Sequence, residues 1–162
     1  MVKMTTGTIV LRLWNGGWLK HNCFGFAPAH SDAELIEKYV GAPAFQETFL
    51  RSEQDDRGTH GPFLADRIKP SDFVPLEESG LEHYLESVNL SLTPGEDEAE
   101  RAKILPHLRK AFAEGGRCYI LKVDERNKDL FHDLGWVLTL FREFLFVFPE
   151  RDRLERFVIG YD

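Results

Sequence analysis

The densest group of chemistry-bearing side chains lies in the segment Asp55-Asp-Arg-Gly-Thr-His-Gly61. In this segment Asp56 could exchange a proton, Arg57 could bind an anion, and His60 could act as an acid or a base near neutral pH. The two glycines would let the backbone approach a ligand closely. The segment is therefore a candidate site for a small-molecule enzyme, although the same composition is typical of a solvated turn, which is the interpretation that we favour.

A second candidate combines a thiol with an imidazole. Cys23 stands close in the sequence to His21 and His30, and a neighbouring imidazole can favour the reactive thiolate. Cys23 also stands beside Phe24 and Phe26, and a buried cysteine behaves as a small hydrophobe. We favour structural burial of Cys23 and keep it, with His30, as a catalytic candidate.

Common enzyme signatures are absent: the sequence has no Gly-x-x-x-x-Gly-Lys-Ser/Thr, Gly-x-Gly-x-x-Gly, Gly-x-Ser-x-Gly or His-Glu-x-x-His. Each of these motifs positions a nucleophile, a metal ion or a phosphate. Cys23 and Cys118 are too few and too far apart for a disulfide framework or a zinc site, which favours reduced thiols in a cytoplasmic protein. We therefore expect no cofactor and no metal ion.

One stretch of the C-terminal third resembles a known family. Leu121-Lys-Val123, Asn127 and Gly135-Trp136 resemble the strand, asparagine and Gly-Phe ending of GNAT-type N-acetyltransferases. The resemblance implies acetyl transfer from acetyl-CoA as an alternative function. The helix predicted from Pro94 lacks the Gln/Arg-x-x-Gly-x-Gly/Ala loop whose amides would hold the pyrophosphate of acetyl-CoA, and this departure counts against the alternative.

The formal net charge of −7 is unevenly distributed, because residues 51 to 100 carry 4 basic and 13 acidic side chains. Binding to nucleic acid relies on a surplus of Lys and Arg, so we expect none. We also expect no membrane association, because Arg142 and Glu143 interrupt the most apolar run. The acidic middle third could engage a basic protein surface, as immunity-type inhibitors do, or could simply be a solvated face.

The first 50 residues predict a hairpin followed by a helix. Residues 5–14 and 18–26 are rich in β-forming side chains on either side of an Asn-Gly-Gly turn. Ser31-Asp-Ala-Glu34 has the form of a capping box and predicts a helix that ends at Gly41. A second short helix is predicted to start at Pro43.

The middle of the chain predicts a long loop and then two helices. Glycines and prolines interrupt residues 51–78, and long loops inside compact domains are often functional. Capping-box patterns that start at Ser79 and Thr93 predict helices over about 80–90 and 94–114. Pro106 predicts a kink or a break in the second of these helices.

The last third predicts strands around one short helix. Residues 117–123 indicate a buried strand and 127–134 a short helix. Residues 136–148 match both the alternation of a strand and the stripe of a helix, and we favour a strand because the charged turn and residues 154–160 then complete a hairpin. We expect this hairpin at an edge of the sheet.

These elements together predict an α+β fold in which an antiparallel sheet of about five strands packs against about four helices, in one domain over residues 1–162. The leading functional hypothesis is a non-catalytic binding or regulatory domain, with an immunity-like domain as one form of it. The alternatives are a relative of the GNAT acetyltransferases and a small-molecule enzyme that uses residues 55–61. The sequence does not decide the oligomeric state.

Overall fold

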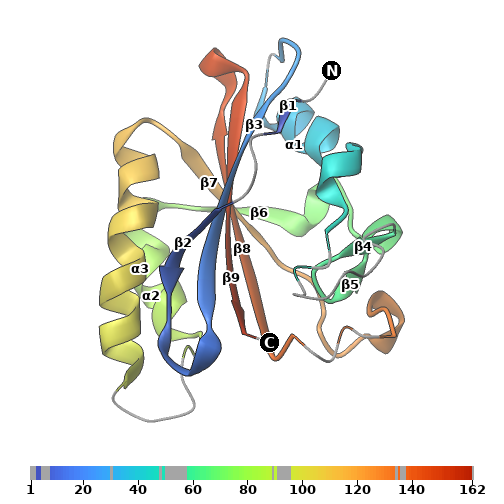
Figure 1. The fold of residues 1–162 in the computed structure, drawn as a ribbon. Coiled ribbons are helices and arrows are strands. Elements are labelled where there is room, and N and C mark those ends of the chain that lie inside the picture. Colours follow the sequence, from blue (N-terminus) through green and yellow to red (C-terminus); the bar gives the residue numbers. More distant parts are fainter. Residues whose placement is uncertain are drawn as a thin grey trace.

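A seven-stranded antiparallel sheet forms the centre of the molecule in the computed structural model (Figure 1). The structure describes residues 3–4, 8–29, 31–47, 49, 58–88, 90, 96–133, 135 and 138–161. The strands of this sheet are β1 (Lys3–Met4), β2 (Thr8–Arg12), β3 (Trp18–Gly25), β6 (Phe73–Leu76), β7 (Arg117–Leu121), β8 (Leu140–Phe148) and β9 (Arg153–Tyr161). The remaining elements are the small sheet of β4 (Thr59–His60) and β5 (Phe63–Leu64) and the helices α1 (Asp32–Val40), α2 (Glu78–Glu86) and α3 (Glu96–Ala113).

The order of the strands is β1-β3-β9-β8-β7-β6, and β2 also pairs with β3. The hairpin of β8 and β9 therefore lies in the middle of the sheet, and our prediction that it forms an edge was wrong. Its position fits the composition of the two strands, because a strand that is covered on both faces carries apolar side chains on both of them, as most positions of β8 and β9 do. The prediction of a strand over the last part of 136–148 is confirmed from Leu140 onward.

The turn of this hairpin is hydrogen-bonded to the segment that follows β3. Pro149–Arg151 forms a 3-10 turn, after which Asp152 adopts a left-handed conformation with a φ of 48°. Asp152 accepts hydrogen bonds from two backbone amides, from Phe26 N to its carbonyl oxygen at 2.9 Å and from Ala29 N to its Oδ1 at 2.9 Å. Aspartate tolerates this conformation better than most residues, so the charged turn has a structural role.

Two apolar clusters cover the two faces of the sheet. Figure 1 shows α2 and α3 on one side, and α1 with the β4–β5 pair on the other. On the first side, Leu81 and Leu85 of α2 and Leu108 of α3 pack against the sheet. Leu35 and Ile36 of α1 pack on the second side. The sheet therefore separates the molecule into an α2/α3 face and an α1 face.

Both edges of the sheet are irregular. At one edge β6 is four residues long and contains Pro75, which has no amide hydrogen to donate. At the other edge β1 and β2 share the side of β3, and the register of β2 shifts between Ile9 and Leu11. Such a shift is the signature of a bulge, which interrupts a hydrogen-bonded edge.

The helices differ from the prediction in number and detail. Within the described residues the structure has three α-helices, and the segment that begins at Pro43 is a single 3-10 turn, Pro43–Phe45. Lys128–Leu130 is also a 3-10 turn, because the segment offers too few residues between Asn127 and the following bridge for an α-helix. α3 continues through Pro106 without dividing, and the predicted cap at Thr93 lies outside the described residues.

The caps of the first two helices have different outcomes. The Ser31 hydroxyl accepts from Glu34 N at 3.2 Å, which is the serine half of the predicted capping box. The cap predicted at Ser79 is wrong, because α2 begins at Glu78, so that Ser79 lies inside the helix, and the N-cap Glu77 makes no side-chain hydrogen bond. Both helices nevertheless present apolar residues to the sheet, Leu35 and Ile36 from α1 and Leu81 and Leu85 from α2.

The expectation of a long loop over 51–78 was only partly right. Its second half contributes β4, β5 and β6, and β6 is a strand of the main sheet. Each of these strands has two to four residues, too few to produce an alternation that a sequence pattern could detect. None of the helices in the described part of the chain is long and apolar enough to cross a membrane.

Candidate functional site

The α1 face contains a group of charged and polar side chains beneath its apolar cluster. His60 from β4, Glu143 from β8, Arg156 from β9 and Tyr39 from α1 are at most 1% exposed. We call these four residues the buried charge cluster. Burying a charge is costly unless it is paired and hydrogen-bonded, so the partners of each member decide whether the cluster can be stable.

His60 is held by two acceptors. Its Nδ1 lies 2.6 Å from the Phe45 carbonyl oxygen, and its Nε2 lies 2.5 Å from Oε2 of Glu143. A carbonyl oxygen can only accept, and a carboxylate can only accept, so both ring nitrogens of His60 carry protons. His60 therefore enters the cluster as a cation. Its ring also stacks on Phe45, with centroids 3.8 Å apart.

Glu143 supplies the negative charge that faces His60. Burial alone would raise the pKa of Glu143, but His60, Arg156 and the Tyr39 hydroxyl together lower this pKa below its usual value. The Tyr39 hydroxyl donates to Oε1 of Glu143 at 2.6 Å. Burial raises the pKa of Tyr39 well above its usual value, so this hydroxyl keeps its proton and can donate it.

Arg156 is the second cation of the cluster. Its Nε donates to Oδ1 of Asn22 at 3.3 Å, its Nη1 donates to the Tyr39 oxygen at 3.3 Å, and its Nη2 donates to Oε2 of Glu47. Its guanidinium also lies over the ring of Phe49, 4.7 Å from the centroid. Two cations, His60 and Arg156, thus meet two carboxylates, Glu143 and Glu47.

The buried charge cluster connects segments that are far apart in the sequence. It joins β4 and α1 to β8 and β9, so it holds residues 58–64 against the sheet. Gly61 lets this segment approach β8 closely, because a Cβ at this position would lie 2.4 Å from the Phe141 ring. Its φ of +55° also favours glycine. The acid and the base of this cluster are paired and shielded from solvent, which fits a structural role and offers no access for a substrate.

The structure separates the candidate residues that it describes. His60 lies on the α1 face, whereas Cys23 lies on the other face, because its neighbours Asn22 and Phe24 point to the α1 face and side chains alternate along a strand. Burial, with Glu155 nearby, raises the pKa of Cys23, which opposes formation of a thiolate. Asp56, Arg57 and His30 lie outside the described residues. The roles of Asp56 and Arg57 in the 55–61 hypothesis, and of His30 beside Cys23, therefore stay predictions.

The residues that carry the acetyltransferase resemblance make local contacts. The side-chain oxygen of Asn127 accepts from Asp129 N at 3.1 Å and caps the 3-10 turn Lys128–Leu130. Trp136 lies outside the described residues. In the described part of the chain no three or more His, Cys, Asp and Glu side chains are grouped so that they could hold a metal ion.

An acidic groove runs between the exposed sides of α2 and α3. Its volume is about 440 Å³, and its lining comprises Glu82, Glu86, Glu98, Arg101, Ala102 and Leu105. Glu78, Glu82 and Glu86 follow one another at intervals of four residues along α2, so their carboxylates share one face of the helix. Arg109 of α3 pairs with Glu82.

Sequence reasoning missed Glu143 and Arg156 as members of one cluster. Each stands next to another charged residue, Arg142 or Glu155, in a strand that is otherwise mostly apolar, and a charge buried in such a strand must find a partner. The sequence shows these adjacent charges, but it does not show which of the two is buried on the α1 face or which residue pairs with it. Glu47 and His60 come from segments without a readable pattern.

Comparisons with known proteins add little. No protein-family model matches this sequence, and no curated protein matches it. Among solved structures, this chain is similar to that of citrus MAF1, with 14% sequence identity and a TM-score of 0.45 over 93% of this chain and 90% of that chain. A likeness at this level transfers no function. The described residues form a mixed α+β arrangement around an antiparallel sheet.

Proposed function

We propose that this chain is a non-catalytic binding domain whose acidic groove, between α2 and α3, takes a basic segment of a partner protein. The observation that supports the proposal is the lining of the groove, which combines three carboxylates and one cation, Arg101, with the apolar side chains of Ala102 and Leu105. A lysine or arginine side chain fits such a site, because its stem packs on apolar surface while its charged end meets the carboxylates.

The charge row on α2 also supports a binding role. Like charges at intervals of four residues on a helix cost stability, by about 0.2–0.5 kcal/mol per pair. Glu78, Glu82 and Glu86 are all exposed. Within the described residues, Arg109 pairs with Glu82 and His83 lies beside Glu86, and no other cation pairs with this row. A basic partner would relieve the repulsion and would be attracted from a distance.

The buried charge cluster supports the non-catalytic part of the proposal. It is the described group that most resembles acid–base machinery, and its members are already paired with one another. General acid–base catalysis requires that a catalytic side chain reach the proton that it transfers. A cluster without solvent access does not meet this requirement.

The test measures the binding of a fluorescent oligolysine peptide to the full chain by anisotropy, at low and at high salt. We expect saturable binding that weakens as salt rises, because screening acts on exposed charges. The triple variant Glu82→Gln, Glu86→Gln, Glu98→Gln should bind about tenfold more weakly, which corresponds to about 1.4 kcal/mol.

The matched control removes three exposed carboxylates elsewhere, with Glu37→Gln, Asp66→Asn and Glu150→Gln. This variant has the same net charge as the groove variant, so it should keep most of the affinity if the groove is the site. Equal losses in the two variants would indicate general attraction to an acidic protein and would contradict the proposal. Failure of the unmodified chain to bind the peptide would contradict it too.

A further inference from the structure

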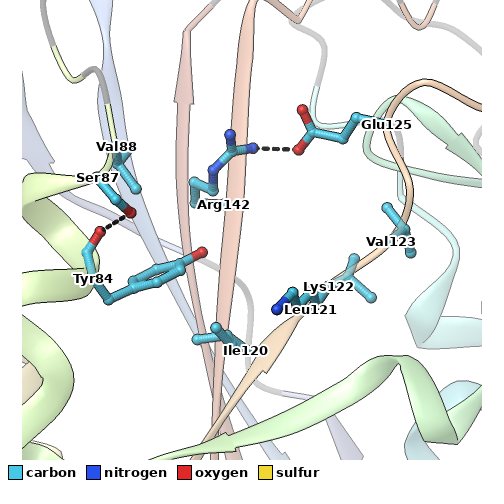
Figure 2. A pocket seen from close by; sticks show the side chains of 9 residues that line it. All are labelled: Tyr84, Ser87, Val88, Ile120, Leu121, Lys122, Val123, Glu125 and Arg142. Carbon is cyan, nitrogen blue, oxygen red and sulfur yellow. Dashed lines mark hydrogen bonds and ion pairs between the residues drawn. The ribbon is translucent and has the colours of Figure 1, made fainter.

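A second pocket opens on the α2/α3 face, beside the C-terminal end of α2. Its volume is about 350 Å³, which is within the range of small-molecule sites. Figure 2 shows that its lining comes from separate elements: Tyr84, Ser87 and Val88 at the end of α2, Ile120 to Val123 at the end of β7, Glu125 in the following loop and Arg142 on β8.

Arg142 is oriented by two hydrogen bonds that leave most of its donors unused. Its Nη1 donates to Oε1 of Glu125 at 2.7 Å and to the Phe141 carbonyl oxygen at 2.7 Å. Neither Nε nor Nη2 has a hydrogen-bond acceptor within the part of the chain that the structure describes. A guanidinium carries five N–H groups in a planar fork, and the free edge of this fork matches a carboxylate or a phosphate.

Tyr84 contributes a hydroxyl that keeps its proton. Its ring packs edge-on against Phe144, with centroids 5.5 Å apart. In Figure 2 the hydroxyl end of the ring points to the space between Arg142 and Lys122. Burial, opposed by Arg142 and reinforced by Glu125, raises the pKa of Tyr84, so the hydroxyl is neutral at neutral pH and can donate to an anion.

Lys122 adds a second positive charge. Its side chain is exposed, and no carboxylate among the described residues forms an ion pair with it. With Arg142, Lys122 and Glu125, the lining of the pocket carries a net charge of +1, whereas the whole chain carries −7. Ile120 and Val88 supply an apolar wall on which the uncharged body of a ligand can pack.

We propose that this pocket binds a small organic anion, whose carboxylate or phosphate group is held by Arg142, Lys122 and the Tyr84 hydroxyl and whose apolar body packs on Ile120 and Val88. Glu125 acts as a positioning residue, because its bond to Nη1 turns the free edge of the Arg142 guanidinium into the pocket. This inference goes beyond the proposed function, because the proposed function concerns a basic partner in the acidic groove between α2 and α3, whereas this pocket would bind an anion.

The experiment titrates the full ¹⁵N-labelled chain at constant ionic strength with four probes, namely benzoate, phenyl phosphate, inorganic phosphate and benzyl alcohol. We expect saturable amide shifts at Tyr84, Ser87, Ile120, Lys122 and Arg142 with benzoate or phenyl phosphate. Affinity for the better of these two should exceed that for benzyl alcohol by about tenfold or more. Tighter binding of benzoate would indicate a carboxylate ligand, and tighter binding of phenyl phosphate would indicate a phosphate ligand. Weaker binding of inorganic phosphate than of phenyl phosphate would show that the apolar wall contributes to affinity.

Three variants test the assignment of the residues. Lys122→Gln changes an exposed side chain and should weaken binding about fivefold or more, whereas Lys128→Gln removes an exposed cation outside the pocket and should have no effect. Tyr84→Phe keeps the packing on Phe144, so a loss of affinity would report on the hydroxyl alone. Thermal melting of each variant confirms that it folds. If Tyr84→Phe does not fold, Lys122→Gln with its control Lys128→Gln still tests the assignment.

Two outcomes would overturn the inference. One is the absence of saturable shifts at these amides with every anionic probe up to about 10 mM, a concentration at which even a millimolar ligand binds. The other is an equal loss of affinity in Lys122→Gln and Lys128→Gln. Binding of oligolysine in the acidic groove is measured separately, so each proposal can fail without the other.

Discussion

The two faces of the sheet achieve their packing in different ways. The α2/α3 face buries an almost continuous layer of leucines, isoleucines and phenylalanines, and Tyr84 and Arg142 line a pocket beside this layer. Its buried carboxylates Glu100 and Glu155 each have a partner, the Trp14 amide and His21 respectively. The α1 face buries His60, Arg156 and the carboxylate of Glu143 beneath its aromatic side chains, with the half-buried Glu47 beside them. The first face is stabilised by apolar area, whereas the second depends on specific pairs, so the two should respond differently to substitution and to pH.

The largest effect is expected when the buried charge cluster loses Arg156. Arg156→Met keeps much of the volume but removes the cation that pairs with Glu47 and that helps to lower the pKa of the buried Glu143. Breaking a buried pair costs about 3–5 kcal/mol. Urea denaturation should show this loss in the free energy of unfolding. The control Arg117→Met removes an exposed arginine paired with Asp32 and should cost less than about 1 kcal/mol. Similar costs for the two variants would remove the distinction between buried and exposed pairs.

A cavity on the α2/α3 face should cost somewhat less and should be insensitive to conditions. Leu108 of α3 is fully buried, and Leu108→Ala should lower the free energy of unfolding by about 3 kcal/mol through lost apolar contacts and a void. Because no charge is involved, this cost should be the same at low and at high salt. A cost that changes with salt would mean that the face is not the apolar layer described above.

Removing a single hydroxyl from each face sharpens the contrast. Tyr39→Phe takes a donor from Glu143 and an acceptor from Arg156, and should cost about 2 kcal/mol because both groups are charged and buried. Tyr84→Phe removes a hydroxyl that has no hydrogen bond within the described residues, and should change the stability by less than about 0.5 kcal/mol. Thermal and urea denaturation of the two variants provide the measurement, and equal costs would contradict the comparison.

Acid should destabilise the α1 face gradually. Because the pKa of Glu143 is lowered from 4.5 in the folded state, the unfolded chain binds more protons in acid, and the stabilisation by Glu143 is present above about pH 4.5 and is lost as the pH falls toward the folded value. Each such group contributes a slope of about 1.4 kcal/mol per pH unit. Urea denaturation over this range should give a shallower slope for Glu143→Gln than for Glu150→Gln, whose carboxylate is exposed. Identical slopes would exclude Glu143 as the source.

How much the sequence could predict depended on the length of each pattern. The hairpin of β8 and β9 was predicted because each strand has nine residues and a charged turn joins them. β4, β5 and β6 were missed because they are too short to show a period, and their positions depend on contacts with distant residues such as Glu143. The edge position of the hairpin was wrong because strand order depends on long-range pairing, which local patterns do not contain.

The candidate sites divide in the same way. His60 was selected for its chemistry, and its imidazole is indeed charged and paired, but its burial follows from β8 and α1 rather than from its own segment. The acidic groove was foreseen only as an excess of charge in the middle third. The pocket of Tyr84, Lys122 and Arg142 was not foreseen, because its residues come from three segments and none carries a motif.

The irregular edges of the sheet have a consequence for the behaviour of the protein at high concentration. An unpaired edge strand can recruit a strand of another molecule, which is a common start of aggregation. Here one edge is a four-residue strand that contains Pro75, and the other is interrupted where β2 changes register. In the part of the chain that the structure describes, the edges of the main sheet therefore offer a second molecule only short or interrupted strands to pair with. The apolar strands β8 and β9, which would aggregate readily if they were exposed, lie inside the sheet between strands that discourage such pairing.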